Sequence, residues 1–286
     1  MSRSVRNRLT ELLLRAFANR QKSAAILWLV LFCTLVSRAK LSEIPLADLL
    51  AEGKAMRLGV DGVAGNSLAD LIGNGRLLRV RRADTSEEMG AELACQTAGV
   101  PWVIGPDPDV SPALAAVCER ARLYADVLSA IDELGSETSG ADPLRRTVVQ
   151  AAACFNAGLF FETHEHLEQI WQLQPPGPTK RFLQGIIQIS VGFHHAQRGS
   201  HDGAVNQLAK GLEKTAGLTG EVLGLDCTAF LPAVARTRDA IVACGRGAMR
   251  PMPLIEVPRM RVLGAGPSRG EQDQGIESRG KKGKRP

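Results

Sequence analysis

The sequence predicts a mainly α-helical protein whose C-terminal part is a compact bundle of about five helices, preceded by a small α/β-like region. After residue 143, apolar residues recur at helical spacing, and short breaks rich in glycine and proline separate the repeats. Short connections between helices favour antiparallel neighbours, and hence a bundle. Between residues 56 and 105, short runs of β-type residues alternate with glycine-containing turns instead.

Residues 1–55 are expected to be a basic N-terminal extension with one short hydrophobic segment. The spacing of apolar residues in 1–23 predicts a basic amphipathic helix. Residues 24–37 are continuously apolar, but a helix of this length spans about 21 Å, less than the roughly 30 Å of a bilayer core. A buried helix or a poorly folded extension is therefore favoured. A signal or membrane anchor is the alternative, because arginines precede the segment.

The small α/β-like region is expected at residues 56–135. Its β-type runs predict strands at 57–63, 76–81 and 100–104, with a hairpin-type turn at Gly73-Asn-Gly75. Thr85 and Glu88 have the spacing of a capping box, which predicts a helix continuing to residue 98. A second helix is expected at 112–134.

Residues 143–263 are expected to form the helical bundle, separated from the preceding region by a glycine- and serine-rich loop at 135–143. Helices are predicted at 144–157, 159–174, 179–199, 202–216 and 226–244. Asp226 is placed to cap the last of them. Residues 264–286 are rich in glycine, serine and charge, and predict a disordered basic tail.

The net charge of +5 comes from basic residues at the two ends of the chain. Such tails do not make a specific nucleic-acid-reading surface, which needs basic residues on a folded face. The chain has six cysteines but no Cys-x-x-Cys motif, which argues against a zinc ribbon or a redox motif. The cysteines are therefore expected to be buried free thiols, and the protein to be located in a reducing cytoplasm. An organelle-targeted or membrane-anchored protein is the alternative. Homo-oligomerisation and membrane contact through residues 24–37 stay open.

All five histidines lie between residues 164 and 201, and two of them belong to a helix rich in glutamate. On a helical wheel, His164 shares the apolar face and Glu168 borders it four residues later, a spacing at which the two side chains can bind one metal ion or each other. Glu165 lies at the margin of that face. Glu162 and His166 point away from it and are expected to face water.

The helix expected at 179–199 carries a second line of polar residues. Gln184, Gln188 and His195 fall on one side of it and require partners if they are buried. The edge of the preceding helix that carries His164 and Glu168 is the expected partner. Gly185 and Gly192 flank this line and would let a neighbouring helix approach closely.

At these residues the chain resembles a family known as domain of unknown function 309. The resemblance rests on Phe155-Asn-Ala-Gly-x-Phe-Phe-Glu-x-His-Glu-x-Leu-Glu-x-x-Trp171, then Arg181-Phe-Leu-Gln-Gly-Ile-Ile-Gln188, His194-His195 and Arg198-Gly-Ser-x-x-Gly-Ala204. Pro258-Arg-Met-Arg261 resembles the family's closing Pro-Arg segment. It extends over roughly 144–263 and leaves the first 140 residues unexplained. It implies a small all-helical bundle without a settled activity. The family's His-Glu and Gln-Gly-x-x-Gln motifs are intact here, whereas Ser200 stands where the family usually has asparagine.

The leading hypothesis is a helical domain that binds a divalent metal ion or a small polar ligand. His164, Glu165, Glu168 and His195 are the candidate metal ligands, and Gln184 and Gln188 the candidate ligand-binding residues. A metal-dependent hydrolase-like enzyme, with Glu165 or Glu168 as general base, is the first alternative. A structural or protein-interaction module, in which the cluster only locks two helices together, is the second.

Overall fold

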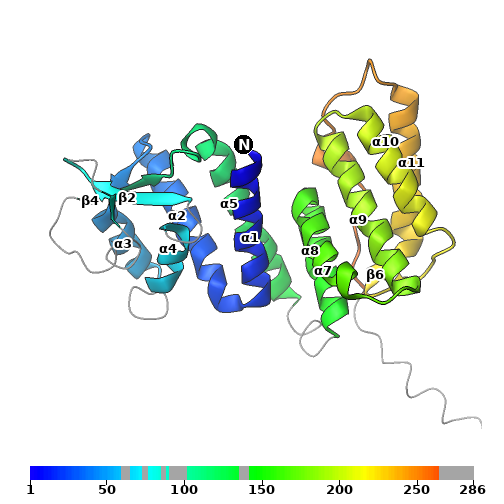
Figure 1. Cartoon of the computed structure of the whole chain (residues 1–286), viewed down its shortest axis with the longest axis horizontal. Helices are drawn as coiled ribbons and strands as arrows, with labels where there is room; N and C mark the ends of the chain where they lie inside the picture. The colour runs from blue at the N-terminus through cyan, green and yellow to red at the C-terminus, as the bar shows by residue number, and fades with distance from the viewer. Residues whose placement is uncertain (59–64, 73–76, 85–87, 90–101, 135–141, 264–286) are drawn as a thin grey trace, which may run out of the picture. The chain divides into compact units, whose positions relative to one another are not determined.

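The computed structural model describes residues 1–58, 65–72, 77–84, 88–89, 102–134 and 142–263 (Figure 1). The chain forms two compact units. The first contains Met1–Glu133 and Ala153–Gln169, and the second contains Leu134–Ala152 and Ile170–Pro286. Two helices, α7 (Pro143–Asn156) and α8 (Phe160–Leu173), contribute residues to both units. The prediction of a mainly α-helical chain with a helical C-terminal region is confirmed.

Helix α2 is the centre of the first unit. It spans Ser23–Ala39 and packs against four helices: α1 (Arg3–Ala18), α3 (Leu46–Ala55), α4 (Gly65–Ile72) and α5 (Leu114–Glu133). Helix α1 begins where the Ser2 side chain accepts a hydrogen bond from the Val5 backbone N–H, at 3.3 Å. Residues 1–55, expected to form a basic extension, are therefore part of a folded unit.

The hydrophobic segment predicted at 24–37 lies within α2. Trp28, Leu29 and Phe32 are all buried, so these apolar side chains form the core of the first unit. Trp28 packs so tightly on α3 that a Cβ atom at Gly53 would lie 2.0 Å from its ring. By length and composition Arg20–Ala39 could also cross a membrane, and it is the one such helix in the described part of the chain.

A four-stranded antiparallel sheet belongs to the same unit. Its strands are β1 (Ile44–Pro45), β2 (Leu78–Arg82), β3 (Glu88–Met89) and β4 (Trp102–Pro106), in the order β1-β4-β2-β3. Strands β2 and β4 correspond to the strands predicted at 76–81 and 100–104. The helix predicted from the capping box is wrong at Glu88 and Met89, because these residues pair with β2 instead. The rest of that helix, the turn at 73–75 and most of the strand at 57–63 lie outside the described residues.

Two of the six cysteines form a disulfide, in contrast to the expectation of free thiols. Cys33 of α2 and Cys118 of α5 are joined, with Cα atoms 5.3 Å apart. The two residues are 85 positions apart in sequence, and only the packing of α2 against α5 brings them together. Cys154 and Cys227 are buried free thiols and Cys244 is an exposed one, whereas Cys95 lies outside the described residues.

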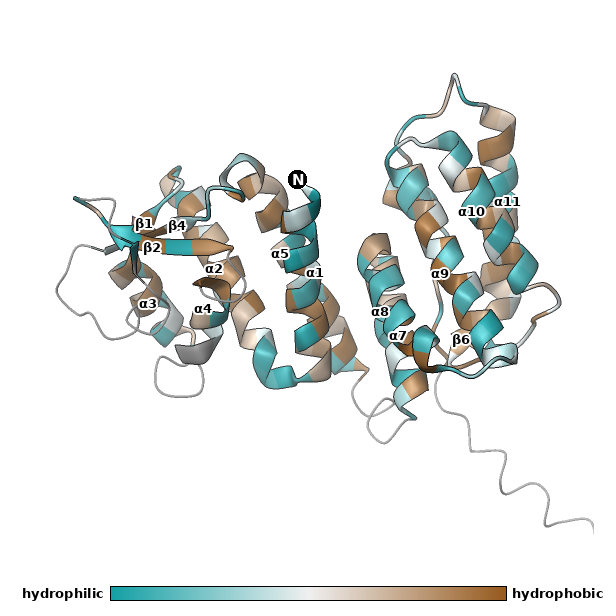
Figure 2. Ribbon diagram, viewed as in Figure 1, coloured by the Kyte–Doolittle hydropathy of each residue, from teal (hydrophilic) through white to brown (hydrophobic). Residues whose placement is uncertain are grey.

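The second unit is helical. Its helices α9 (Pro178–Gln197), α10 (His201–Lys214) and α11 (Cys227–Cys244) lie where helices are expected, and in Figure 2 polar and apolar residues alternate along them. Asp226 caps α11 as predicted, since its carboxylate accepts hydrogen bonds from the backbone N–H groups of Thr228 and Ala229. A short hairpin of β5 (Glu221–Val222) and β6 (Leu225–Asp226) precedes α11. Most of the loop at 135–143 and the tail from residue 264 lie outside the described residues.

Glycines let α9 and α10 pack closely, as the sequence predicts for Gly185 and Gly192. A Cβ atom at Gly185 would lie 2.5 Å from Cγ2 of Thr215, and one at Gly192 would lie 2.7 Å from the Leu208 side chain. The closest approach of the two helices to a backbone atom is at Gly211, where a Cβ atom would lie 2.8 Å from the backbone oxygen of Gly185. A backbone atom cannot rotate away, so this contact requires glycine.

Gly211→Ala is therefore expected to lower the free energy of unfolding by about 1–3 kcal/mol, because the added methyl group forces α9 and α10 apart. Urea unfolding followed by circular dichroism would measure this loss. Gly247→Ala is the matched control, since nothing lies within 4 Å of a Cβ atom there. Equal stability of the two variants would show that the helices separate without cost.

Candidate functional site

The glutamate- and histidine-rich segment forms the first turns of α8. The preceding helix α7 ends at Asn156, and the chain then turns into α8 at Gly158, whose φ of +77° favours glycine. Phe160 packs edge-on against Phe155 of α7, with ring centroids 5.0 Å apart. This aromatic contact fixes the start of α8 and thereby the direction of the side chains that follow.

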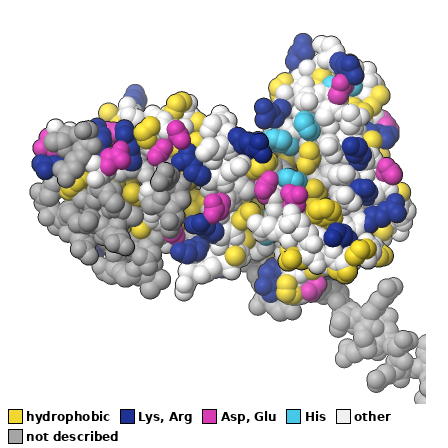
Figure 3. Space-filling view, viewed as in Figure 1, with side chains coloured by type: hydrophobic (Ala, Val, Ile, Leu, Met, Phe, Trp, Pro, Cys, Tyr) yellow, Lys and Arg dark blue, Asp and Glu magenta, His cyan; other side chains and the backbone are white. Residues whose placement is uncertain are grey.

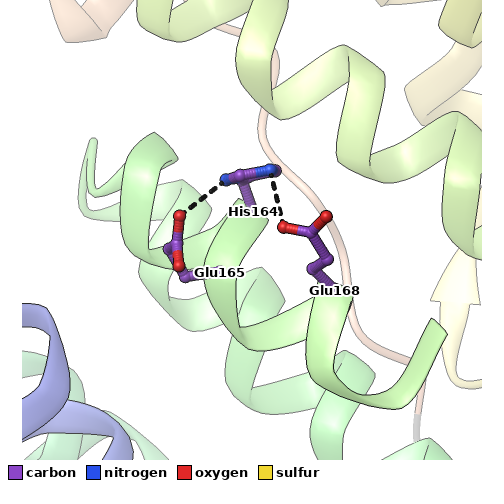
Figure 4. A group of neighbouring side chains, drawn as sticks. All are labelled: His164, Glu165 and Glu168. Carbon is purple, nitrogen blue, oxygen red and sulfur yellow. Dashed lines mark ion pairs between the residues drawn. The ribbon is translucent and has the colours of Figure 1, made fainter. Parts of the chain in front are cut away.

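His164, Glu165 and Glu168 gather on α8, with the imidazole between the two carboxylates (Figure 4). The Nδ1 atom of His164 lies 3.3 Å from Oε1 of Glu165, and its Nε2 atom lies 3.2 Å from Oε2 of Glu168. One potential ligand atom from each residue can be chosen so that all lie within 4.8 Å of one another. The i,i+4 spacing predicted from the sequence thus places His164 and Glu168 in direct contact.

The cluster is accessible to solvent. The side chains of His164, Glu165 and Glu168 are 23%, 38% and 37% exposed, and Figure 3 shows histidine and acidic side chains together at the molecular surface. Glu165 also lines a groove of about 430 Å³ between α1 and α8. Its other polar lining residues include Asn7, Glu11, Arg15 and Gln169. Ions and small molecules can therefore reach the cluster.

The prediction that Glu162 and His166 face water is wrong. Glu162 is 0% exposed and His166 is 7% exposed. The reason is that α1 and α5 cover the side of α8 that the helical wheel assigned to solvent. His166 packs against Phe17 near the end of α1, with ring centroids 4.8 Å apart. The first residues of the chain, expected to form an extension, supply this cover.

Glu162 is held by residues from two other helices. Its carboxylate accepts hydrogen bonds from Nε and Nη2 of Arg120, at 2.6 and 2.7 Å, and from the Tyr124 hydroxyl, at 2.6 Å. The Thr10 hydroxyl of α1 lies 3.4 Å from the same carboxylate and shares its hydrogen with the Arg6 backbone oxygen, 3.0 Å away. This arrangement joins α1, α5 and α8 through one buried charge, with a two-pronged arginine contact that suits a carboxylate.

The charge of this network follows from its contacts. Burial alone would raise the pKa of Glu162, but the hydrogen bonds and charge of Arg120 outweigh burial, so the pKa of Glu162 is lowered. Burial and the neighbouring Glu162 carboxylate raise the pKa of the Tyr124 hydroxyl, which therefore stays a proton donor. The pair Glu162–Arg120 is consequently ionised inside the first unit.

The His166 imidazole is also buried. Burial lowers its pKa from 6.5 to about 4. Its imidazole is therefore neutral near pH 7 and acts as part of the core between α1 and α8. A metal-binding role for His166 is not supported by this position.

The remaining predicted site residues belong to the second unit. Gln184 and Gln188 are half-buried on α9, and the Oε1 atom of Gln188 has no hydrogen-bond partner within the described residues. His195 lies near the end of α9 and packs on α10, where a Cβ atom at Gly203 would lie 2.4 Å from its Nδ1 atom. The structure thus groups His164, Glu165 and Glu168 in one unit. A common site with Gln184, Gln188 and His195 stays a prediction.

Comparison with known proteins places the histidine–glutamate helix in a recognisable segment. Residues 148–207 match DUF309, a domain of unknown function. The DUF309 match contains α8, α9 and the start of α10, so the resemblance found in the sequence motifs is confirmed for this segment. It covers well under half of the chain and leaves the N-terminal helices and the sheet outside.

One curated relative is an uncharacterised protein, YpuF, of Bacillus subtilis strain 168. It is 38% identical over 53 residues, which are 18% of this chain and 30% of that protein. The aligned part thus spans less than a third of the relative's length. No solved structure matches the chain.

Proposed function

We propose that the His164–Glu165–Glu168 cluster binds a divalent metal ion. The observation that carries this proposal is the 3.2 Å distance between Nε2 of His164 and Oε2 of Glu168. Two ligand atoms each about 2.1 Å from one ion lie roughly 3.0–3.4 Å apart when the angle at the metal is octahedral or tetrahedral. The two atoms thus have the separation of neighbouring metal ligands.

Glu165 has a different role in this proposal. Its carboxylate lies beside Nδ1 of His164, so it accepts a hydrogen bond from Nδ1–H and leaves the lone pair of Nε2 free for the ion. A carboxylate behind a ligating histidine orients the ring and strengthens the ligand. Imidazole and carboxylate together suit zinc and similar transition-metal ions. Water molecules or a bound ligand would complete the coordination from the solvent side.

The experiment is isothermal titration of the metal-free full-length chain with Zn²⁺ and, separately, Mn²⁺. One ion per chain is expected. His164→Ala and Glu168→Gln should weaken binding at least ten-fold, because each removes a direct ligand, and Glu165→Gln should weaken it by about ten- to one-hundred-fold. Glu119→Gln is the matched control, since Glu119 is exposed on α5 and lies outside the cluster.

The same titration tests the predicted ligand from the second unit. His195→Ala should weaken binding only if His195 joins the metal site. Unchanged affinity in His164→Ala, with a folded protein by circular dichroism, would contradict the proposal. It would favour the structural alternative, in which the cluster only locks two helices together.

A further inference from the structure

The Cys33–Cys118 disulfide opens onto a pocket in the first unit. The pocket has a volume of about 380 Å³ and is formed by the ends of α2 and α5 that carry the two cysteines. This volume lies within the roughly 300–1,000 Å³ of small-molecule sites. Both cysteines belong to its lining, so a small molecule in the pocket can reach the sulfur–sulfur bond.

The two sulfur-bearing residues differ in accessibility. Cys33 is 0% exposed within the core of the first unit, whereas Cys118 is only partly buried. Thiol–disulfide exchange requires a thiolate to approach one sulfur in line with the bond that breaks. Cys118 is therefore the sulfur that an incoming thiol can attack, and Cys33 is the leaving group.

The charged residues of the pocket are cationic. Lys40 follows α2 and Arg122 lies one turn after Cys118 on α5, and both side chains are exposed. The other lining residues in the described part of the chain are apolar or neutral: Val36, Ser37, Leu41, Leu114 and Ala115. Positive charge attracts an anionic ligand and stabilises a thiolate near the disulfide.

We propose that this pocket is a thiol-exchange site for a low-molecular-weight thiol that carries carboxylates. The thiolate attacks Sγ of Cys118, forms a mixed disulfide and releases Cys33 as a thiolate, which takes up a proton. A second thiol attacks the small-molecule sulfur of the mixed disulfide and releases Cys118. Overall, two small thiols are oxidised to their disulfide and the two cysteines are reduced, so electrons and protons balance.

The site links the redox state of its surroundings to the first unit. The disulfide joins α2, which forms the centre of this unit, to α5, which supplies Arg120 and Tyr124 to the buried glutamate. Disulfides in reducing compartments are usually transient and catalytic or redox-sensing, whereas in oxidising compartments they persist. The exchange therefore adds or removes a covalent link between two core helices.

The first test maps the attacked sulfur. Full-length protein with Cys244→Ser, which removes the exposed free thiol, is oxidised, treated with graded glutathione, alkylated and analysed by peptide mapping. A Cys33–Cys118 linked peptide is expected before treatment, and a glutathione adduct on Cys118 during it. With oxidised glutathione, Cys33→Ser should react at Cys118 at least ten-fold faster than Cys118→Ser reacts at Cys33.

The second test concerns charge. Reduction by glutathione should slow by roughly ten-fold at low salt in Lys40→Gln/Arg122→Gln, while reduction by neutral 2-mercaptoethanol should not change. Arg38→Gln is the matched control, because Arg38 lies at the end of α2 but does not line the pocket. Absence of the linked peptide after oxidation, adducts on Cys33, or equal glutathione rates in all variants would each overturn the proposal.

Discussion

Replacement of Glu162 by alanine is expected to lower the free energy of unfolding by about 3–5 kcal/mol, a larger loss than we expect from Gly211→Ala. Glu162 is fully buried and accepts hydrogen bonds from both Arg120 and Tyr124. Its removal leaves the largely buried Arg120 guanidinium and the Tyr124 hydroxyl without their acceptor. An uncompensated buried charge costs more than the ion pair itself contributes.

Urea unfolding of the metal-free protein, followed by circular dichroism, would measure this loss. Glu165→Ala is the matched control on the same helix. Its side chain is partly exposed, so the substitution should change stability by no more than about 0.5 kcal/mol. The double variant Glu162→Leu/Arg120→Met should regain much of the stability that Glu162→Ala loses, because neither buried charge is then present. A loss below about 1 kcal/mol in Glu162→Ala would contradict the view that this network holds α1, α5 and α8 together.

The helices could be predicted because their signals are local. The apolar spacing, the cap at Asp226 and the glycines of α9 are each contained within a few neighbouring residues. The same holds for His164 and Glu168, which the helical repeat alone brings into contact. The strand at Glu88–Met89 was missed because the local sequence has the pattern of a helix cap. Its pairing with β2 cannot be seen in the sequence of the short segment alone.

The burial of Glu162 and His166 could not be predicted from the wheel of α8 alone. A helical wheel finds one apolar face, but α8 is covered on a second side, where polar side chains bond Glu162 and Phe17 packs against His166. Glu162 bonds to Thr10, which is 152 residues away, and to two residues of α5. In the sequence, a buried charged residue cannot be told from an exposed one when its partner is far away along the chain. The Cys33–Cys118 pair was missed because its two residues are 85 positions apart and meet only through the packing of α2 against α5.

Acidification is expected to destabilise the protein before its buried ion pair is protonated, because of His166. Its pKa is about 4 in the folded protein and near 6.5 in the unfolded chain. Well above pH 7 His166 is neutral in both states and contributes no pH dependence. Below pH 6.5 the unfolded chain binds a proton that the folded protein does not, so stability falls as pH falls and levels off below about pH 4. The loss should reach about 2 kcal/mol at pH 5 and about 3 kcal/mol at pH 4.

His166→Gln isolates this contribution, because glutamine does not titrate. The substitution can also change the stability at pH 7, so the comparison is the change between pH 7 and pH 5 rather than the absolute value. Glu162, whose pKa is lowered in the folded protein, also loses its contribution to stability as the pH falls, but at lower pH than His166 does. A proton NMR titration of the His166 ring should show it neutral down to about pH 4. If His166→Gln lost as much stability as the wild type between pH 7 and pH 5, the proton uptake would belong to other groups, and His166 would not be a neutral part of the core.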